Sequence, residues 1–191
     1  MKKYPFRKFK AWSYRINNQK FKTVLLLIFA FCSFGVHQQK DKASEYNLKA
    51  AFIYNFTKYI DWKAAPTDNE FIIGIMGASP INDPLVEIVK TETVDNKKIT
   101  IKHFNKPSDI SFCHILFISQ NTSASLDDIL TKTSNKGMLV ISEQDGYAEQ
   151  GSAINFVIVN NKLKFEANVK AINSAGLTAS SQLLKLAIII N

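Results

Sequence analysis

The chain has 191 residues, of which 46% are apolar, so it is long enough for one domain with a substantial hydrophobic core. Its formal net charge of +8 is concentrated at the start, where eight of the 24 basic residues fall in residues 1–22 and no acidic residue occurs. The other sixteen basic residues balance the sixteen acidic ones, and both arginines lie in the first segment. A phosphate-binding surface normally uses the bidentate arginine fork, so this composition argues against nucleic-acid binding.

The basic segment leads into the apolar run 23–34, TVLLLIFAFCSF. This run is too short to span a bilayer comfortably and has the length of a signal-peptide core. Because Ser33 and Gly35 supply small residues before a cleavage site, we predict a signal peptide over residues 1–35 and export to an oxidising compartment. Two alternatives stay open: an uncleaved membrane anchor, since the basic segment is long, and a lipoprotein modified at Cys32, against which the bulky Phe31 argues.

Residues 36–44, VHQQKDKAS, are polar and are predicted to form a flexible tether before a domain over residues 45–191. Ser44 is a plausible N-cap of a first helix that runs to about Tyr59. The apolar residues of this helix form two stripes, and only one of them is needed to pack on a sheet. The second stripe is either buried within the same domain or covered by a partner. In the second case Tyr54, Lys58 and Trp62 are candidates for a homodimer or partner interface.

The remaining pattern predicts alternating strands and helices. Asn160-Asn161 separates two apolar runs and fits a type I′ hairpin turn, because asparagine tolerates positive φ. The order indicates an α/β fold, a three-layer sandwich whose central mixed, mostly parallel sheet of five or six strands is flanked by helices. The expected strands are 71–76, 98–103, 114–119, 137–142, 153–159 and 163–167, and the expected helices are 84–89, 126–133 (capped by Ser123 or Ser125) and most of 168–191, with a break at Gly176.

No motif for catalysis, a cofactor or a metal stands out. Cys113 and His114 are adjacent on a predicted strand, so their side chains point to opposite faces and cannot form a dyad. After cleavage Cys113 is the single cysteine, which excludes an intramolecular disulfide. The pair in Glu143-x-Asp145 is read as a solvated turn. Gly-x-x-Gly at 74–77 is read as a tight turn, with a small ligand at the carboxyl end of the strand as the alternative. We therefore predict a protein that is not an enzyme and has no cofactor or metal.

Polar residues on the two hairpin strands form a second candidate feature. Glu166 points inward only if it finds a partner, which Lys49, Lys58 or Lys170 can provide. We predict a structural polar cluster, not a catalytic acid. Its members are Lys49, Asn155, Glu166 and Asn168.

Four segments resemble the periplasmic YfiR family in their order and spacing: residues 46–62, 113–119, 153–171 and 175–187. The resemblance extends from about Glu45 to Ile189. It implies an α/β envelope signalling protein, a homodimer, that represses an inner-membrane diguanylate cyclase by binding the periplasmic sensor region of that enzyme, with release under envelope or redox stress. The alternative is a small-molecule-binding domain that reports to a sensor kinase or an outer-membrane receptor.

The sequence departs from that family at its cysteines. Members often place on the first strand a cysteine that is able to bridge to the position of Cys113, and here Gly74 holds that place. The second cysteine pair of the family, near the hairpin, is also missing. A redox switch based on an intramolecular disulfide is therefore not expected.

Overall fold

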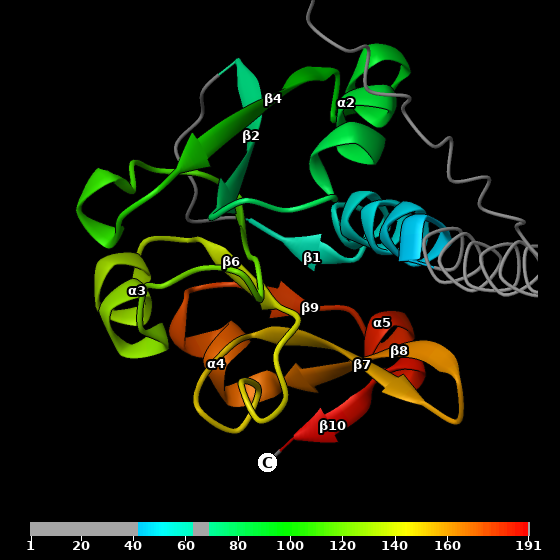
Figure 1. The fold of residues 1–191 in the computed structure, drawn as a ribbon, viewed down its shortest axis with the longest axis vertical. Coiled ribbons are helices and arrows are strands. Elements are labelled where there is room, and N and C mark those ends of the chain that lie inside the picture. The colour runs from blue at the N-terminus through cyan, green and yellow to red at the C-terminus, as the bar shows by residue number, and fades with distance from the viewer. Residues whose placement is uncertain (1–41, 63–68, 191) are drawn as a thin grey trace, which may run out of the picture. The chain divides into compact units, whose positions relative to one another are not determined.

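The computed structural model describes residues 42–62 and 69–190, and these are built around an eight-stranded sheet (Figure 1). The predicted signal peptide and most of the predicted tether lie outside the described residues. The strand order is β10-β8-β7-β6-β5-β2-β4-β3. The strands are β2 (Glu70–Met76), β3 (Thr93–Val94), β4 (Lys97–Phe104), β5 (Ile115–Ile118), β6 (Leu139–Ser142), β7 (Ile154–Val159), β8 (Lys162–Asn168) and β10 (Ile188–Ile190).

Pairing within the sheet is parallel except at β7–β8 and β3–β4, which are antiparallel. The predicted α/β class with a mixed, mostly parallel sheet is thus confirmed, but the predicted five or six strands are wrong. The short strands β3 and β10 extend the sheet at its two edges, and a separate two-stranded ribbon joins β1 (Ile60–Asp61) to β9 (Thr178–Ala179). Strands of two or three residues leave too little alternation in the sequence to be recognised.

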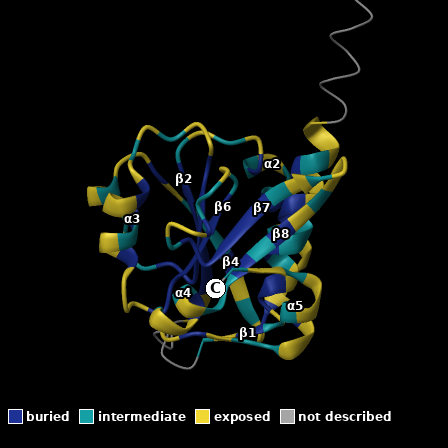
Figure 2. Ribbon diagram, turned by 90° about the horizontal axis from the view of Figure 1, so that it is seen from below, coloured by how far each residue is buried: buried dark blue, intermediate teal, exposed yellow. Residues whose placement is uncertain are grey.

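Helices lie on both faces of the sheet. They comprise residues 42–56, α2 (Asn82–Thr91), α3 (Leu126–Thr133), α4 (Val169–Ser174) and α5 (Ser181–Leu186), with a 3-10 turn, η1, at Pro107–Asp109. Along β2, Ile73 packs in the core that contains Ile53 and Leu85, whereas Ile72 packs in the core that contains Ile129. Both faces of the central strands are therefore buried, as their dark blue colour in Figure 2 shows, and this explains their continuous apolar sequences. None of the described helices is long and apolar enough to cross a membrane.

The structure confirms the predicted hairpin turn and the predicted N-cap of the helix that starts at Leu126. Asn160 and Asn161 have φ values of 51° and 58°, which confirms the type I′ hairpin between β7 and β8. Ser125 caps α3, since its side chain accepts a hydrogen bond from the Asp128 backbone N–H. The first helix differs from the prediction, because residues 42–44 already belong to it and Ser44 is not its N-cap.

The C-terminal segment contradicts the prediction of mostly helix. It contains two helices of six residues and the strands β9 and β10. The side chains of Asn168 and Ser180 each cap a new helix start, and Gly176 breaks the chain between them at φ 78°. The final three isoleucines are β-branched and prefer an extended backbone, so they form β10.

Candidate functional site

A buried ion pair lies where the parallel strands β5 and β6 end. Glu143 directly follows β6, and its side chain is 1% exposed. Lys49 reaches it from the helix 42–56, with its side chain 6% exposed and its ammonium nitrogen 2.6 Å from Glu143 Oε2. The carboxyl ends of parallel strands are the usual place for a ligand in an α/β sheet. Here that place is filled by a charge pair from the protein itself.

Further side chains complete the hydrogen bonding of this pair. The Tyr46 hydroxyl donates to Glu143 Oε1 at 3.2 Å, and the Gln120 backbone N–H donates to the same oxygen at 3.1 Å. The ammonium group of Lys49 also contacts Glu45 at 2.6 Å. We call these five residues, Glu45, Tyr46, Lys49, Gln120 and Glu143, the Glu143 cluster. Because each buried charge has several partners, the cluster fastens the first helix to the sheet edge.

The electrostatics of the Glu143 cluster favour a structural role. The pKa of Tyr46 is raised to about 12, mainly by burial of the hydroxyl and secondly by the nearby Glu143 carboxylate. The hydroxyl therefore stays protonated and keeps donating to Glu143 near neutral pH. A cavity of about 280 Å³ borders the cluster, between Lys49, Glu143 and the apolar residues Phe156 and Leu163.

The predicted polar cluster is only partly brought together. Glu166 accepts a hydrogen bond from the Asn155 side-chain amide at 3.0 Å, and Asn155 accepts one from the Ser142 hydroxyl at 2.7 Å. Lys49 pairs with Glu143 and not with Glu166, and Lys58 lies over the Tyr54 ring. Asn168 is also separate, since its amide donates to the Ala148 carbonyl and its oxygen caps α4.

The three predicted interface residues do not lie together in one surface feature. The Lys58 ammonium lies 4.5 Å from the centroid of the Tyr54 ring, and the Tyr54 hydroxyl donates to Glu92 at the end of α2. Trp62 makes internal contacts instead: its indole N–H donates to the His114 carbonyl at 3.2 Å, and its ring packs edge-on against Phe71. Tyr54 and Lys58 therefore form one surface feature, whereas Trp62 is partly buried and packs against the hydrophobic core.

Cys113 and His114 face opposite sides of the sheet, as predicted. Cys113 is fully buried in the core that contains Ile129, and burial raises the pKa of its thiol to about 12. His114 stacks on Phe71 in the other core, and its Nδ1 accepts a hydrogen bond from the Ile72 N–H at 3.0 Å. In the described part of the chain, no group of three or more His, Cys, Asp or Glu side chains is arranged to hold a metal ion.

Sequence reasoning missed Glu143 as a site residue. The pattern Glu143-x-Asp145 is typical of a solvated turn, and Asp145 is indeed exposed. The available signal was its position directly after the apolar strand 139–142, which places a carboxylate at the carboxyl edge of a parallel sheet. The opposing lysine is 94 residues away and cannot be paired with it by local pattern.

The fold and these contacts define an α/β domain whose buried polar groups pair with one another. A comparison with family profiles gives a more specific result. The profile DUF4154, described as YfiR/HmsC-like, matches residues 46–188. The chain therefore belongs to the YfiR/HmsC-like family, which confirms the resemblance drawn from its four segments. A search of curated proteins found no match.

Proposed function

We propose that this protein is a periplasmic signalling regulator that binds and represses a membrane-bound sensor enzyme of the diguanylate cyclase type. Its membership of the YfiR/HmsC-like family over residues 46–188 is the observation that carries this proposal. The predicted signal peptide over residues 1–35 supports the periplasmic location. The partner is then the periplasmic sensor region of an inner-membrane enzyme.

The surface that we propose for this contact surrounds Tyr54 and Lys58. Lys58 is exposed, and its charge is held above the Tyr54 ring, which orders a long side chain before any partner arrives. Tyrosine is enriched among the residues that contribute most to binding at protein interfaces. The carboxylate of Glu92 fixes the other end of Tyr54. Such a feature fits an acidic side chain on the partner that approaches Lys58.

Repression of this kind requires that the regulator bind the inactive state of the sensor more tightly than the active state. The helix that carries Tyr54 is anchored to the sheet by the Glu143 cluster, so the contact surface is rigid. Release by a stimulus then needs a change that lowers affinity for the inactive state. A disulfide within the described residues cannot provide that change, because Cys113 is their one cysteine.

A second function is favoured by a different feature, a cavity of about 350 Å³ between α3 and α4. The apolar residues that line it include Leu130, Met138 and Val140, and the polar ones include Asn168 and Lys170. Ligand sites are mostly apolar clefts of about 300–1,000 Å³ with a few polar groups. In this alternative the protein binds a small molecule and reports it to a sensor kinase or an outer-membrane receptor.

Crosslinking in native membranes tests the proposal. The tagged protein, recovered after export, is crosslinked to membranes of its own cells, and partners are identified by mass spectrometry. We expect specific recovery of one inner-membrane cyclase, and a loss of most of that recovery with Lys58→Glu combined with Tyr54→Ala. Lys90→Glu, an exposed lysine on α2, is the matched control. Equal recovery with all three proteins would contradict the proposed surface. Recovery of a sensor kinase or an outer-membrane receptor in place of a cyclase would favour the ligand-binding alternative.

A further inference from the structure

The cavity of about 350 Å³ between α3 and α4 has walls that the protein builds from its own hydrogen bonds. At the start of α4 the Asn168 side chain donates to the Ala148 carbonyl at 2.8 Å and accepts from the Ala171 N–H at 2.8 Å, so it ties the loop before β7 to this helix. At the end of α4 the Gly137 N–H donates to the Ala175 carbonyl at 3.0 Å and ties the turn after α3 to the same helix. The cavity is therefore preformed, as ligand sites usually are.

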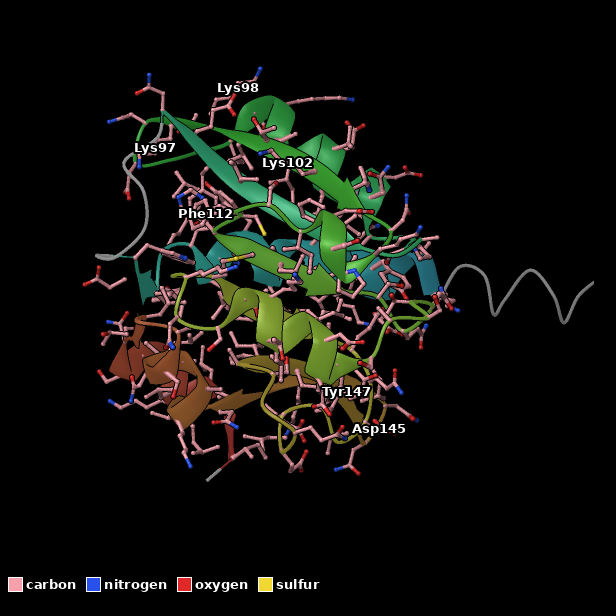
Figure 3. All side chains as sticks on the ribbon, turned by 90° about the vertical axis from the view of Figure 1, so that its left-hand side faces the viewer. Lys97, Lys98, Lys102, Phe112, Asp145 and Tyr147 are labelled. Atoms are coloured by element: carbon pink, nitrogen blue, oxygen red, sulfur yellow. The ribbon has the colours of Figure 1, made fainter. Side chains whose placement is uncertain are left out.

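The loop between β6 and β7 is also held against α3. Tyr147 of this loop, labelled in Figure 3, packs against the core that contains Ile129 of α3. Gly151 comes so close to α3 that a β-carbon on it would lie 3.0 Å from Leu130 Cδ1. Its φ of 113° is a conformation that other residues rarely adopt, so this close approach depends on glycine. Because Gly151 and Leu130 both line the cavity, these contacts fix the loop as one of its walls.

The buried residues that line the cavity are mainly apolar. Met138, Val140 and Ala153 are each at most 4% exposed. The buried polar residue is Thr133, and its hydroxyl already donates to the Ile129 carbonyl at 3.0 Å. No buried side-chain nitrogen or oxygen in the described part of the chain lacks a hydrogen-bond partner. A polar ligand group would lose its hydrogen bonds to water here and meet mostly apolar side chains, so the buried end of a ligand must be apolar.

The exposed residues that line the cavity are polar and carry both signs of charge. They are Ser134, Asn135, Glu149, Gln150, Lys170 and Ser174. Glu149 and Lys170 supply one negative and one positive charge, and neither forms an ion pair within the described residues. A charged ligand end would be attracted by one of them and repelled by the other. The exposed lining therefore favours a polar ligand end without a charge.

We propose that this cavity binds a small amphipathic molecule with an apolar body and an uncharged polar end, such as an alcohol or an amide. The apolar body lies against Leu130, Met138 and Val140, and the polar end stays among the exposed residues, where water and side chains can bond to it. An apolar cavity of about 150 Å³ holds a molecule of the size of benzene, so this one holds roughly twelve non-hydrogen atoms. The inference names the ligand class for the second candidate function, on which it rests, and the repressor function does not depend on it.

Methyl NMR tests this proposal, with octanol as the probe and with protein that is recovered after export and labelled at its methionine methyl groups. Met1 lies in the predicted signal peptide, so the two signals come from Met138, which lines the cavity, and Met76, which does not. We expect octanol to shift the Met138 signal in a saturable manner and to leave the Met76 signal unchanged, and we expect octanoate and octylamine to bind more weakly. An unchanged Met138 signal, equal shifts of both signals, or a charged probe that binds as tightly as octanol would overturn the proposal.

Substitutions connect the binding to this cavity. Ala171→Leu enlarges a lining residue of α4 and should abolish the shift of the Met138 signal by octanol, whereas Ala51→Leu, the same change at a partly exposed alanine of the first helix, should bind octanol like the wild type. If Ala171→Leu does not fold, Leu130→Gln decides the matter, because Leu130 is partly exposed and the new amide replaces an apolar contact.

Undiminished octanol binding in Ala171→Leu or in Leu130→Gln would contradict the proposed site. The measurement uses the purified protein alone, so a negative result does not bear on the crosslinking test of the repressor function.

Discussion

The position that a β-carbon would take on Gly74 lies 2.9 Å from the sulfur of Cys113. Gly74 lies on β2, and Cys113 lies beside it in the segment that leads into β5. Glycine at this place leaves the Cys113 thiol without a partner sulfur. The same position is 2.8 Å from a ring carbon of Phe104, so the glycine also makes room for the core. A cysteine in place of Gly74 would therefore lie within reach of the Cys113 sulfur.

Gly74→Cys is predicted to form a disulfide with Cys113. The bridge needs two sulfurs about 2.05 Å apart, and the close approach of the two positions places a second sulfur within reach. The oxidised variant should lose both free thiols and melt at a higher temperature without reductant than with it. Thiol titration of the unfolded protein and thermal melts measure this. Two free thiols after oxidation would contradict the arrangement.

Gly74→Ala is the matched control for that variant, because it adds the β-carbon without the sulfur. We expect a loss of about 1–3 kcal/mol of unfolding free energy, the usual cost of overpacking a well-filled core. Phe104 must move for the methyl group to fit. Chemical denaturation measures the loss, and an unchanged midpoint would mean that the core is looser here than described.

Cys113 is predicted to resist alkylation in the folded protein. Burial raises the pKa of its thiol from 9.0 to about 12, so almost no thiolate exists at pH 8. The raised pKa of the thiol also makes the stability of the folded protein depend on pH. Above pH 9 the unfolded chain loses the thiol proton and the folded protein keeps it, so this contribution is intact below pH 9 and is lost as the pH rises toward 12. Iodoacetamide labelling with and without denaturant tests the first point. Rapid labelling of the folded protein would contradict it.

Removal of the charge of Lys49 should be far more costly than the same change at Lys90. Lys49→Met leaves the Glu143 carboxylate buried without its cation, for which we expect a loss of about 3–5 kcal/mol. Lys90 pairs with Glu87 in an exposed position, so Lys90→Met should change stability by less than about 1 kcal/mol. Urea denaturation of both variants measures the difference. Equal effects would show that the Glu143 cluster does not anchor the first helix.

The hairpin turn gives a prediction about backbone strain. Asn161 has φ 58°, a conformation that glycine adopts at no steric cost. Asn161→Gly should therefore keep the stability of the protein, whereas Asn161→Val should lower it, because β-branched residues are strained there. Thermal melts compare the two. A valine variant as stable as the wild type would mean that the turn relaxes to another type.

Features set by local sequence were predictable here, and those set by distant contacts were not. Asn160-Asn161 and Ser125 determine their own turn and cap within a few residues, so pattern alone identified them. Lys49 and Glu143 meet only after the sheet has formed, and the choice of Glu143 over Glu166 depends on where the first helix crosses it. β10 was read as helix because three residues carry no period, and only pairing with β8 makes them a strand.

Cyclase activity in native membranes tests the central claim most directly. Purified protein is added to membrane vesicles with an exposed periplasmic face, prepared from cells that lack this protein, and the synthesis of cyclic di-GMP is measured. We predict that the wild type lowers the rate in a saturable manner, that Lys58→Glu with Tyr54→Ala loses most of this effect, and that Lys90→Glu retains it. A rate that stays unchanged at saturating wild-type protein would contradict the account of this chain as a cyclase repressor.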